Sequence, residues 1–239
     1  MAAANKKPRV LVLGHSFVRR LREFAAQNHS GGPYDLNLGL SNVCSIDLHR
    51  IGGRSVDKMI RNDLDKIRSA APNNVVLELG SNELCDKDSD SETIAFSILA
   101  LAELLLTELS LRFIAVCEVT ARQNEPFVGY NERAALLNSH LRESLHVIPA
   151  AKCWQHRGLI NPTNNAVYAP DGIHLNYIGN KALNRSYRGA ILICGHYPKS
   201  SNVKLNFLRL DNLLRVEFGT LQLFNQWNLA PCVLMQFLR

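Results

Sequence analysis

Three residues of this sequence could together turn a hydroxyl group into a nucleophile. Asp171 and His174 stand three residues apart, and Ser16 lies near the other end of the chain. A serine attacks a carbonyl when an imidazole accepts its proton and a carboxylate orients that imidazole. If folding brings Ser16 to His174, the sequence predicts a serine hydrolase. Without that contact, Asp171 and His174 would form only a capped turn, and Ser16 would only cap a helix.

Acyl transfer also requires hydrogen-bond donors that face the developing oxyanion. Gly53 lacks a Cβ, so its backbone N–H can approach a ligand closely, and Gly52 is an alternative. Asn82 carries an uncharged amide donor. A third donor is the N–H of Ser16, because a helix is predicted to begin there and helix N-termini favour anions.

Buried strands and amphipathic helices alternate along the chain. Apolar runs typical of covered parallel strands predict strands over 9–13, 43–51, 75–79, 112–119 and 146–149. Helical spacing of apolar residues predicts helices over 17–27, 55–70, 91–109, 131–143 and 176–193. We expect Ser16 to cap the first helix. The alternation predicts an α/β fold with a five-stranded parallel sheet.

Polar and glycine residues follow three of these predicted strands. They are Gly14-His15-Ser16, Gly52-Gly53 and Gly80-Ser81-Asn82. Ligands of parallel α/β sheets bind beyond the carboxyl ends of the strands. We therefore expect Ser16, Gly53 and Asn82 to meet at one rim of the sheet.

Four segments carrying these residues resemble the conserved blocks of the SGNH hydrolases, also called GDSL esterases and lipases. The segments are 10–16, 51–55, 77–83 and 171–176, in the family's order, and the likeness spans roughly residues 8 to 195. It implies a flavodoxin-like three-layer α/β/α sandwich. It also implies hydrolysis of a carboxylic ester or O-acetyl group through an acyl-enzyme, with no metal or other cofactor.

The same resemblance assigns a role to each candidate residue. Ser16 is the nucleophile, His174 the base and Asp171 the group that orients it. The oxyanion hole consists of Ser16, Gly53 and Asn82. The partner it implies is a small ester or acylated molecule.

Two positions depart from the family's pattern. His15 and Glu83 both stand where aspartate is usual. Neither position supplies a catalytic group, so the reaction class is unchanged, although activity could be reduced. The alternative is a non-hydrolytic module that binds a ligand or a partner protein in the same cleft. Because SGNH-like domains also occur in proteins of mobile genetic elements, this alternative includes a nucleic-acid context.

The net charge of +6 is compatible with weak attraction to nucleic acid. The basic residues are scattered, however, which favours an ordinary solvated surface. The first apolar run ends at Gly14 and is too short for a signal peptide's core or a membrane span.

Six cysteines without a C-x-x-C pair favour free thiols over disulfides or a zinc site, and hence a cytoplasmic protein. They are Cys44, Cys85, Cys117, Cys153, Cys194 and Cys232.

The chain divides into three predicted regions. Residues 1–8 form a short extension, and residues 9–198 form the α/β domain. The segment 199–239 has no clear period or turn pattern, and its structure stays open.

Overall fold

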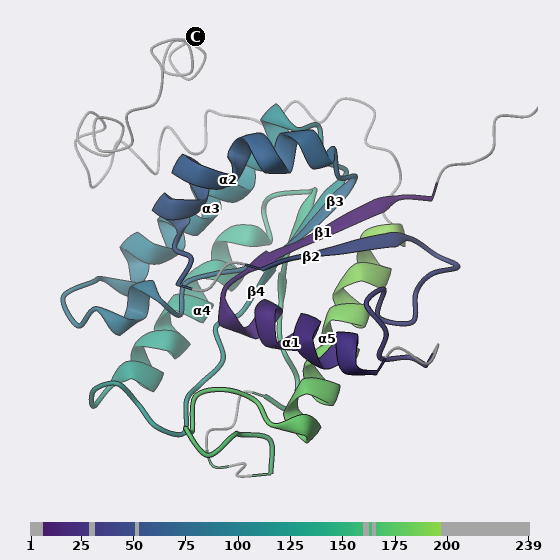
Figure 1. Cartoon of the computed structure of the whole chain (residues 1–239). Coiled ribbons are helices and arrows are strands. Elements are labelled where there is room, and N and C mark those ends of the chain that lie inside the picture. The colour runs from purple at the N-terminus through teal and green to yellow at the C-terminus, as the bar shows by residue number, and fades with distance from the viewer. Residues whose placement is uncertain (1–6, 29–31, 51–52, 160–162, 164–165, 197–239) are drawn as a thin grey trace, which may run out of the picture. The chain divides into compact units, whose positions relative to one another are not determined.

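A five-stranded parallel sheet forms the centre of the domain (Figure 1). The computed structural model describes residues 7–28, 32–50, 53–159, 163 and 166–196. The strands are β1 (Arg9–Gly14), β2 (Ser45–Arg50), β3 (Asn74–Glu78), β4 (Phe113–Cys117) and β5 (Ala151–Trp154). Their order is β2-β1-β3-β4-β5. Strands β3 and β4 are buried throughout, because both faces of the sheet are covered.

Helices cover the two faces in unequal numbers. The helices are α1 (Ser16–Gln27), α2 (Val56–Ala70), α3 (Ser91–Glu108), α4 (Tyr130–Leu145) and α5 (Tyr177–His196). A short 3-10 helix, η1, spans Glu83–Cys85. Figure 1 shows α1 and α5 packed together on one face, with α2, α3 and α4 on the other. The predicted three-layer α/β/α architecture is therefore confirmed.

The strand order places the ends of β1 and β3 beside each other. Gly14, the last residue of β1, is paired with Glu78, the last residue of β3. A side chain at Gly14 would put its Cβ 2.8 Å from the Cβ of Glu78 and 2.6 Å from Val18. Only glycine allows this close approach, so the turn that leads to Ser16 lies directly against β3.

Helix α3 is apolar on more than one side. Its buried residues include Ile98, Leu101 and Leu105, and also the carboxyl-bearing Glu103. Among the described residues, no helix combines the length and apolar character needed to cross a membrane.

One strand prediction was wrong, and one predicted segment lies outside the described residues. The fifth strand is Ala151–Trp154, and the predicted segment 146–149 instead forms the turn after α4. Val147 and Ile148 suit a strand, but only the later residues pair with β4, through Ile114 and Ala151. The predicted extension 199–239 lies outside the described residues.

Candidate active site

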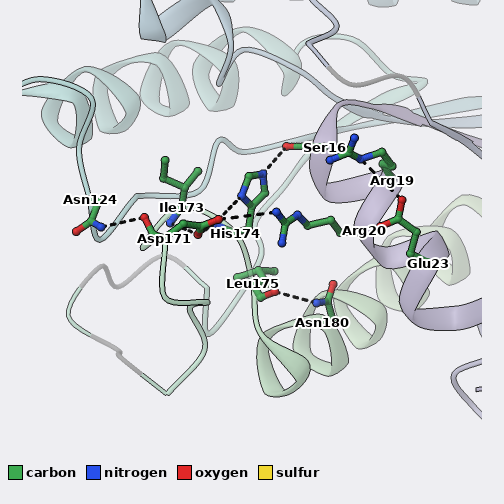
Figure 2. A network of polar contacts seen from close by, with 10 residues as sticks. All are labelled: Ser16, Arg19, Arg20, Glu23, Asn124, Asp171, Ile173, His174, Leu175 and Asn180. Atoms are coloured by element: carbon green, nitrogen blue, oxygen red, sulfur yellow. Dashed lines mark hydrogen bonds and ion pairs between the residues drawn. The ribbon is translucent and has the colours of Figure 1, made fainter. Parts of the chain in front are cut away.

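Ser16, His174 and Asp171 form one hydrogen-bonded chain, although Ser16 and His174 are 158 residues apart in sequence (Figure 2). The Oγ of Ser16 lies 3.2 Å from Nε2 of His174. On the other side of the ring, Nδ1 of His174 lies 2.7 Å from Oδ2 of Asp171. An imidazole between a hydroxyl and a carboxylate is the geometry that activates a serine.

Asp171 is fixed by the turn in which it lies. Its Oδ1 accepts hydrogen bonds from the backbone N–H groups of His174 (2.8 Å) and Ile173 (3.0 Å). Burial opposes ionisation, but these donors and the imidazole outweigh it and lower the pKa of Asp171 to about 2. Arg20 of α1 adds a positive charge 3.8 Å from Oδ2 (Figure 2). Asp171 is therefore a carboxylate at neutral pH.

A neighbouring loop holds the Asp171 turn in place. The backbone N–H groups of Gln123 and Asn124 donate to the carbonyl of Gly172 at 2.8 and 3.0 Å. The side-chain amide of Asn124 donates to the carbonyl of Asp171 at 2.9 Å. Gly172 has φ +64°, and a Cβ there would lie 2.5 Å from Asn124. Glycine is thus required both by the backbone conformation and by the packing.

Ser16 begins helix α1, but it does not cap it. The N-cap is His15, whose Nδ1 accepts from the N–H of Phe17 at 3.5 Å. The prediction that Ser16 caps this helix was wrong, because its side chain turns to His174 instead. As a first-turn residue, Ser16 has a backbone N–H without a partner inside the helix. That N–H and the helix dipole favour an anion beside the hydroxyl.

Asn82 and Gly53 lie on two connected loops of the same rim. The side-chain Nδ2 of Asn82 donates to the carbonyl of Arg54 at 2.7 Å, which links the end of β3 to the loop after β2. The amide carries a second hydrogen that can bind an oxyanion. Gly53 has φ +67°, and no described heavy atom lies within 4 Å of where its Cβ would stand. Both residues can therefore supply donors to a ligand at this rim; Gly52 lies outside the described residues.

Glu83 and Arg54 give these loops their rigidity. Oε1 of Glu83 accepts from the N–H of Val56 at 2.7 Å, at the start of α2. Burial raises the pKa of Glu83, despite this hydrogen bond. The guanidinium of Arg54 is buried against Asp63, with N–O distances of 2.7 and 2.8 Å. Glu83 thus anchors a helix beside the candidate oxyanion hole.

A buried polar cluster lies below the rim, and the sequence did not reveal it. Oε2 of Glu78 accepts from Tyr187 Oη and lies against His156 Nε2, each at 2.8 Å. Ser186 Oγ lies 2.8 Å from His156 Nδ1. Glu78, Cys117 and His156 bring one potential metal-binding atom each within 4.8 Å of one another. Burial raises the pKa of Cys117 well above its usual value, and hydrogen bonds already account for the arrangement, so we assign no metal to it.

Comparison with solved structures identifies the architecture. No protein-family model and no curated protein matches the chain. A GDSL-like lipase from Bacteroides thetaiotaomicron VPI-5482 is similar at a TM-score of 0.61 and 14% identity, over 81% of this chain and 92% of that one. A carbohydrate acetylesterase family member from Sinorhizobium meliloti gives 0.58 and 16%, over 78% and 98%.

A third similar structure is a psychrotrophic esterase from Pseudoalteromonas sp. inhibited by monoethylphosphonate. It has a TM-score of 0.55 and 14% identity, over 78% of this chain and 98% of that one. Each likeness covers nearly the whole of the other protein. The domain has the fold of the SGNH hydrolases, the superfamily that its four sequence segments resemble.

Proposed function

We propose that this protein is a serine esterase that cleaves a carboxylic ester or O-acetyl group through Ser16, His174 and Asp171. The observation that carries the proposal is the 3.2 Å separation of Ser16 Oγ and His174 Nε2, with Asp171 2.7 Å behind the imidazole. The fold of esterases and lipases supports the same reaction class. The catalytic unit is the domain over residues 9–198, and the five free thiols among the described cysteines are compatible with a cytoplasmic location.

Acylation begins when Ser16 Oγ attacks the ester carbonyl. The hydroxyl proton moves to Nε2 of His174, and the carbonyl oxygen becomes an oxyanion. The N–H groups of Ser16 and Gly53 and the amide of Asn82 stabilise that charge. The resulting imidazolium is stabilised by the ionised Asp171. His174 then donates its proton to the departing alcohol, and the acyl group stays on Ser16.

Deacylation repeats these steps with water. His174 accepts a proton from the water as its oxygen attacks the acyl carbon, and the same donors hold the second oxyanion. Collapse of that intermediate releases the carboxylic acid, and the proton on His174 returns to Ser16 Oγ. The reaction requires no group beyond the protein's own residues and water.

The test measures hydrolysis of p-nitrophenyl acetate and labelling by a fluorophosphonate probe. The unaltered protein should hydrolyse the ester and form a covalent adduct that peptide mapping assigns to Ser16. Ser16→Ala should lose both properties. Ser139→Ala is the matched control, because Ser139 is on α4 and its hydroxyl bonds to Glu143. Equal hydrolysis by the unaltered protein and Ser16→Ala would contradict the proposal. If the unaltered protein also forms no adduct at Ser16, the non-hydrolytic binding module is the better explanation.

A further inference from the structure

A buried hydrogen bond joins the residues that precede Ser16 and Asn82. His15 Nε2 lies 2.9 Å from Ser81 Oγ, and the two residues are 2% and 4% exposed. His15 follows the last residue of β1, and Ser81 follows β3 by three positions. The bond therefore connects the candidate nucleophile's turn with the candidate oxyanion loop.

The tautomer of His15 follows from its two contacts. Nδ1 accepts from the N–H of Phe17, so it carries no proton. The proton of the neutral ring is then on Nε2, which donates to Ser81 Oγ. Burial lowers the pKa of His15 to about 4, so the ring is neutral near pH 7. One side chain thus caps α1 with one nitrogen and holds the β3 loop with the other.

Ser81 is itself fixed from the opposite side. Its carbonyl accepts from Arg122 Nη2 at 3.0 Å and from Tyr130 Oη at 3.3 Å. The guanidinium of Arg122 stacks 4.4 Å from the centre of the Tyr130 ring. Arg122 and Tyr130 are both buried. Ser81 is consequently held in place by Arg122 and Tyr130, and His15 bonds to it from the other side.

We propose that His15 is a positioning residue whose hydrogen bond to Ser81 sets the separation between Ser16 and the oxyanion donor Asn82. This inference rests on the proposed esterase function. A substrate carbonyl must present its carbon to Ser16 and its oxygen to Asn82 at the same time. A misplacement of about 1 Å in such a site can cost on the order of 10²-fold in rate.

Two substitutions at His15 separate its two hydrogen bonds. Asparagine is a good N-cap and can still accept from Phe17, but it is too short to reach Ser81. Glutamine is long enough to donate an amide hydrogen to Ser81, but it no longer caps the helix in the same way. If His15 acts only by stabilising the helix, His15→Asn should keep more activity than His15→Gln. If His15 positions the Ser81 loop, His15→Gln should keep more activity than His15→Asn.

The experiment measures kcat and KM for p-nitrophenyl acetate, together with urea unfolding, for a set of variants. His15→Asn should lower kcat roughly 10- to 100-fold, with KM and the unfolding midpoint near those of the unaltered protein. Ser81→Ala should lower kcat by a similar factor. The double variant His15→Asn with Ser81→Ala should lose no more kcat than either single variant, because both remove the same hydrogen bond. His15→Gln should recover most of kcat. Leu136→Ala, at an exposed site on α4, is the control.

The outcomes separate this inference from the proposed function. If the unaltered protein neither hydrolyses esters nor labels at Ser16, both proposals fail. If it is active and His15→Asn keeps full kcat, only the positioning role is overturned. Multiplicative losses in the double variant would also overturn it, because they would show that His15 and Ser81 act independently. If His15→Asn does not fold, Ser81→Ala decides, and full kcat in that variant would contradict the proposal.

Discussion

The side-chain amide of Asn82 donates to the backbone carbonyl of Arg54 at 2.7 Å. This contact joins the loop after β3 to the loop after β2. Because Arg54 is held by Asp63, the amide nitrogen of Asn82 is kept in one orientation. A preorganised donor needs no rearrangement as negative charge develops, and this is the physical basis of the oxyanion role that we propose for Asn82.

Replacing Asn82 by alanine should slow ester hydrolysis by roughly 10²- to 10³-fold in kcat, as expected for the loss of one oxyanion donor. KM should change little, because the donor acts mainly on the oxyanion of the transition state. Steady-state kinetics on p-nitrophenyl acetate would measure both values. An unchanged kcat would show that Asn82 only connects the two loops.

Replacing Asp171 by asparagine should preserve the turn and abolish most activity. The backbone N–H groups of Ile173 and His174 would keep an oxygen at the Oδ1 position. The amide NH₂ would then face Nδ1 of His174 and force the proton onto Nε2, which could no longer accept one from Ser16. We expect kcat to fall roughly 10³- to 10⁴-fold. Circular dichroism and urea unfolding should stay close to those of the unaltered protein, and an active variant would argue against the triad.

Replacing Gly172 by alanine should disturb the same turn by a different route. The left-handed backbone at φ +64° disfavours a side chain, and the new Cβ would meet Asn124 at 2.5 Å. We expect a loss of about 1–3 kcal/mol in unfolding free energy, with a fall in kcat as His174 moves. Asn124→Gly removes the collision but also the hydrogen bond from Asn124 to the carbonyl of Asp171, so it is measured alone as the reference. The double variant Gly172→Ala with Asn124→Gly should lose less stability than the sum of the two single losses. Additive losses would mean that the collision is unimportant.

The buried groups His15 and Glu103 should give pH dependences of opposite sign. Burial lowers the pKa of His15 from 6.5 to about 4, so between these values the unfolded chain binds more protons and stability rises with pH. Burial raises the pKa of Glu103 from 4.5 to about 7, so there the folded chain binds more protons and stability falls as pH rises. Each effect amounts to about 3 kcal/mol across its range.

Urea unfolding between about pH 4 and pH 7 would separate the two contributions. Relative to the unaltered protein, Glu103→Gln should become progressively more stable as pH rises, because the penalty for burying a carboxylate is gone. His15→Asn should instead gain relative stability as pH falls. Parallel curves for all three proteins would show that neither group changes its protonation on folding in this range.

Much of the fold could be predicted from local patterns. The apolar runs ending at Gly14 and near Gly80 correspond to β1 and β3, and the predicted helix limits agree closely with α1 to α5. The short strand β5 was misplaced, because as an edge strand it is half-exposed and lacks a strong apolar run. Strand β5 is set by its hydrogen bonds to β4. Pairing with a strand that is distant in the sequence leaves no pattern in the residues of β5 themselves.

The sequence predicted the residue types of the candidate site, but not the residues that hold them in place. Ser16, Asn82, Asp171 and His174 stand in short recognisable segments. In the sequence, His15 and Glu83 are only departures from the residues that the resemblance leads one to expect. Their roles as a helix cap and a loop anchor depend on contacts with Phe17 and Val56. Contacts between two loops form only when the fold brings the loops together. The spacing of residues along the chain does not predict such contacts.

Local sequence accounts for the alternation of strands and helices, the glycines at strand ends and the chemical groups available there. These properties depend on neighbours within a few residues. The 3.2 Å approach of Ser16 and His174 across 158 residues, and the contact of His15 with Ser81, arise from tertiary packing. Those distances depend on strand order, register and helix packing, which are set by the burial of the whole apolar core. A short segment specifies its own backbone conformation through interactions among neighbouring residues. Its distance to a remote segment depends instead on how all the intervening elements pack together.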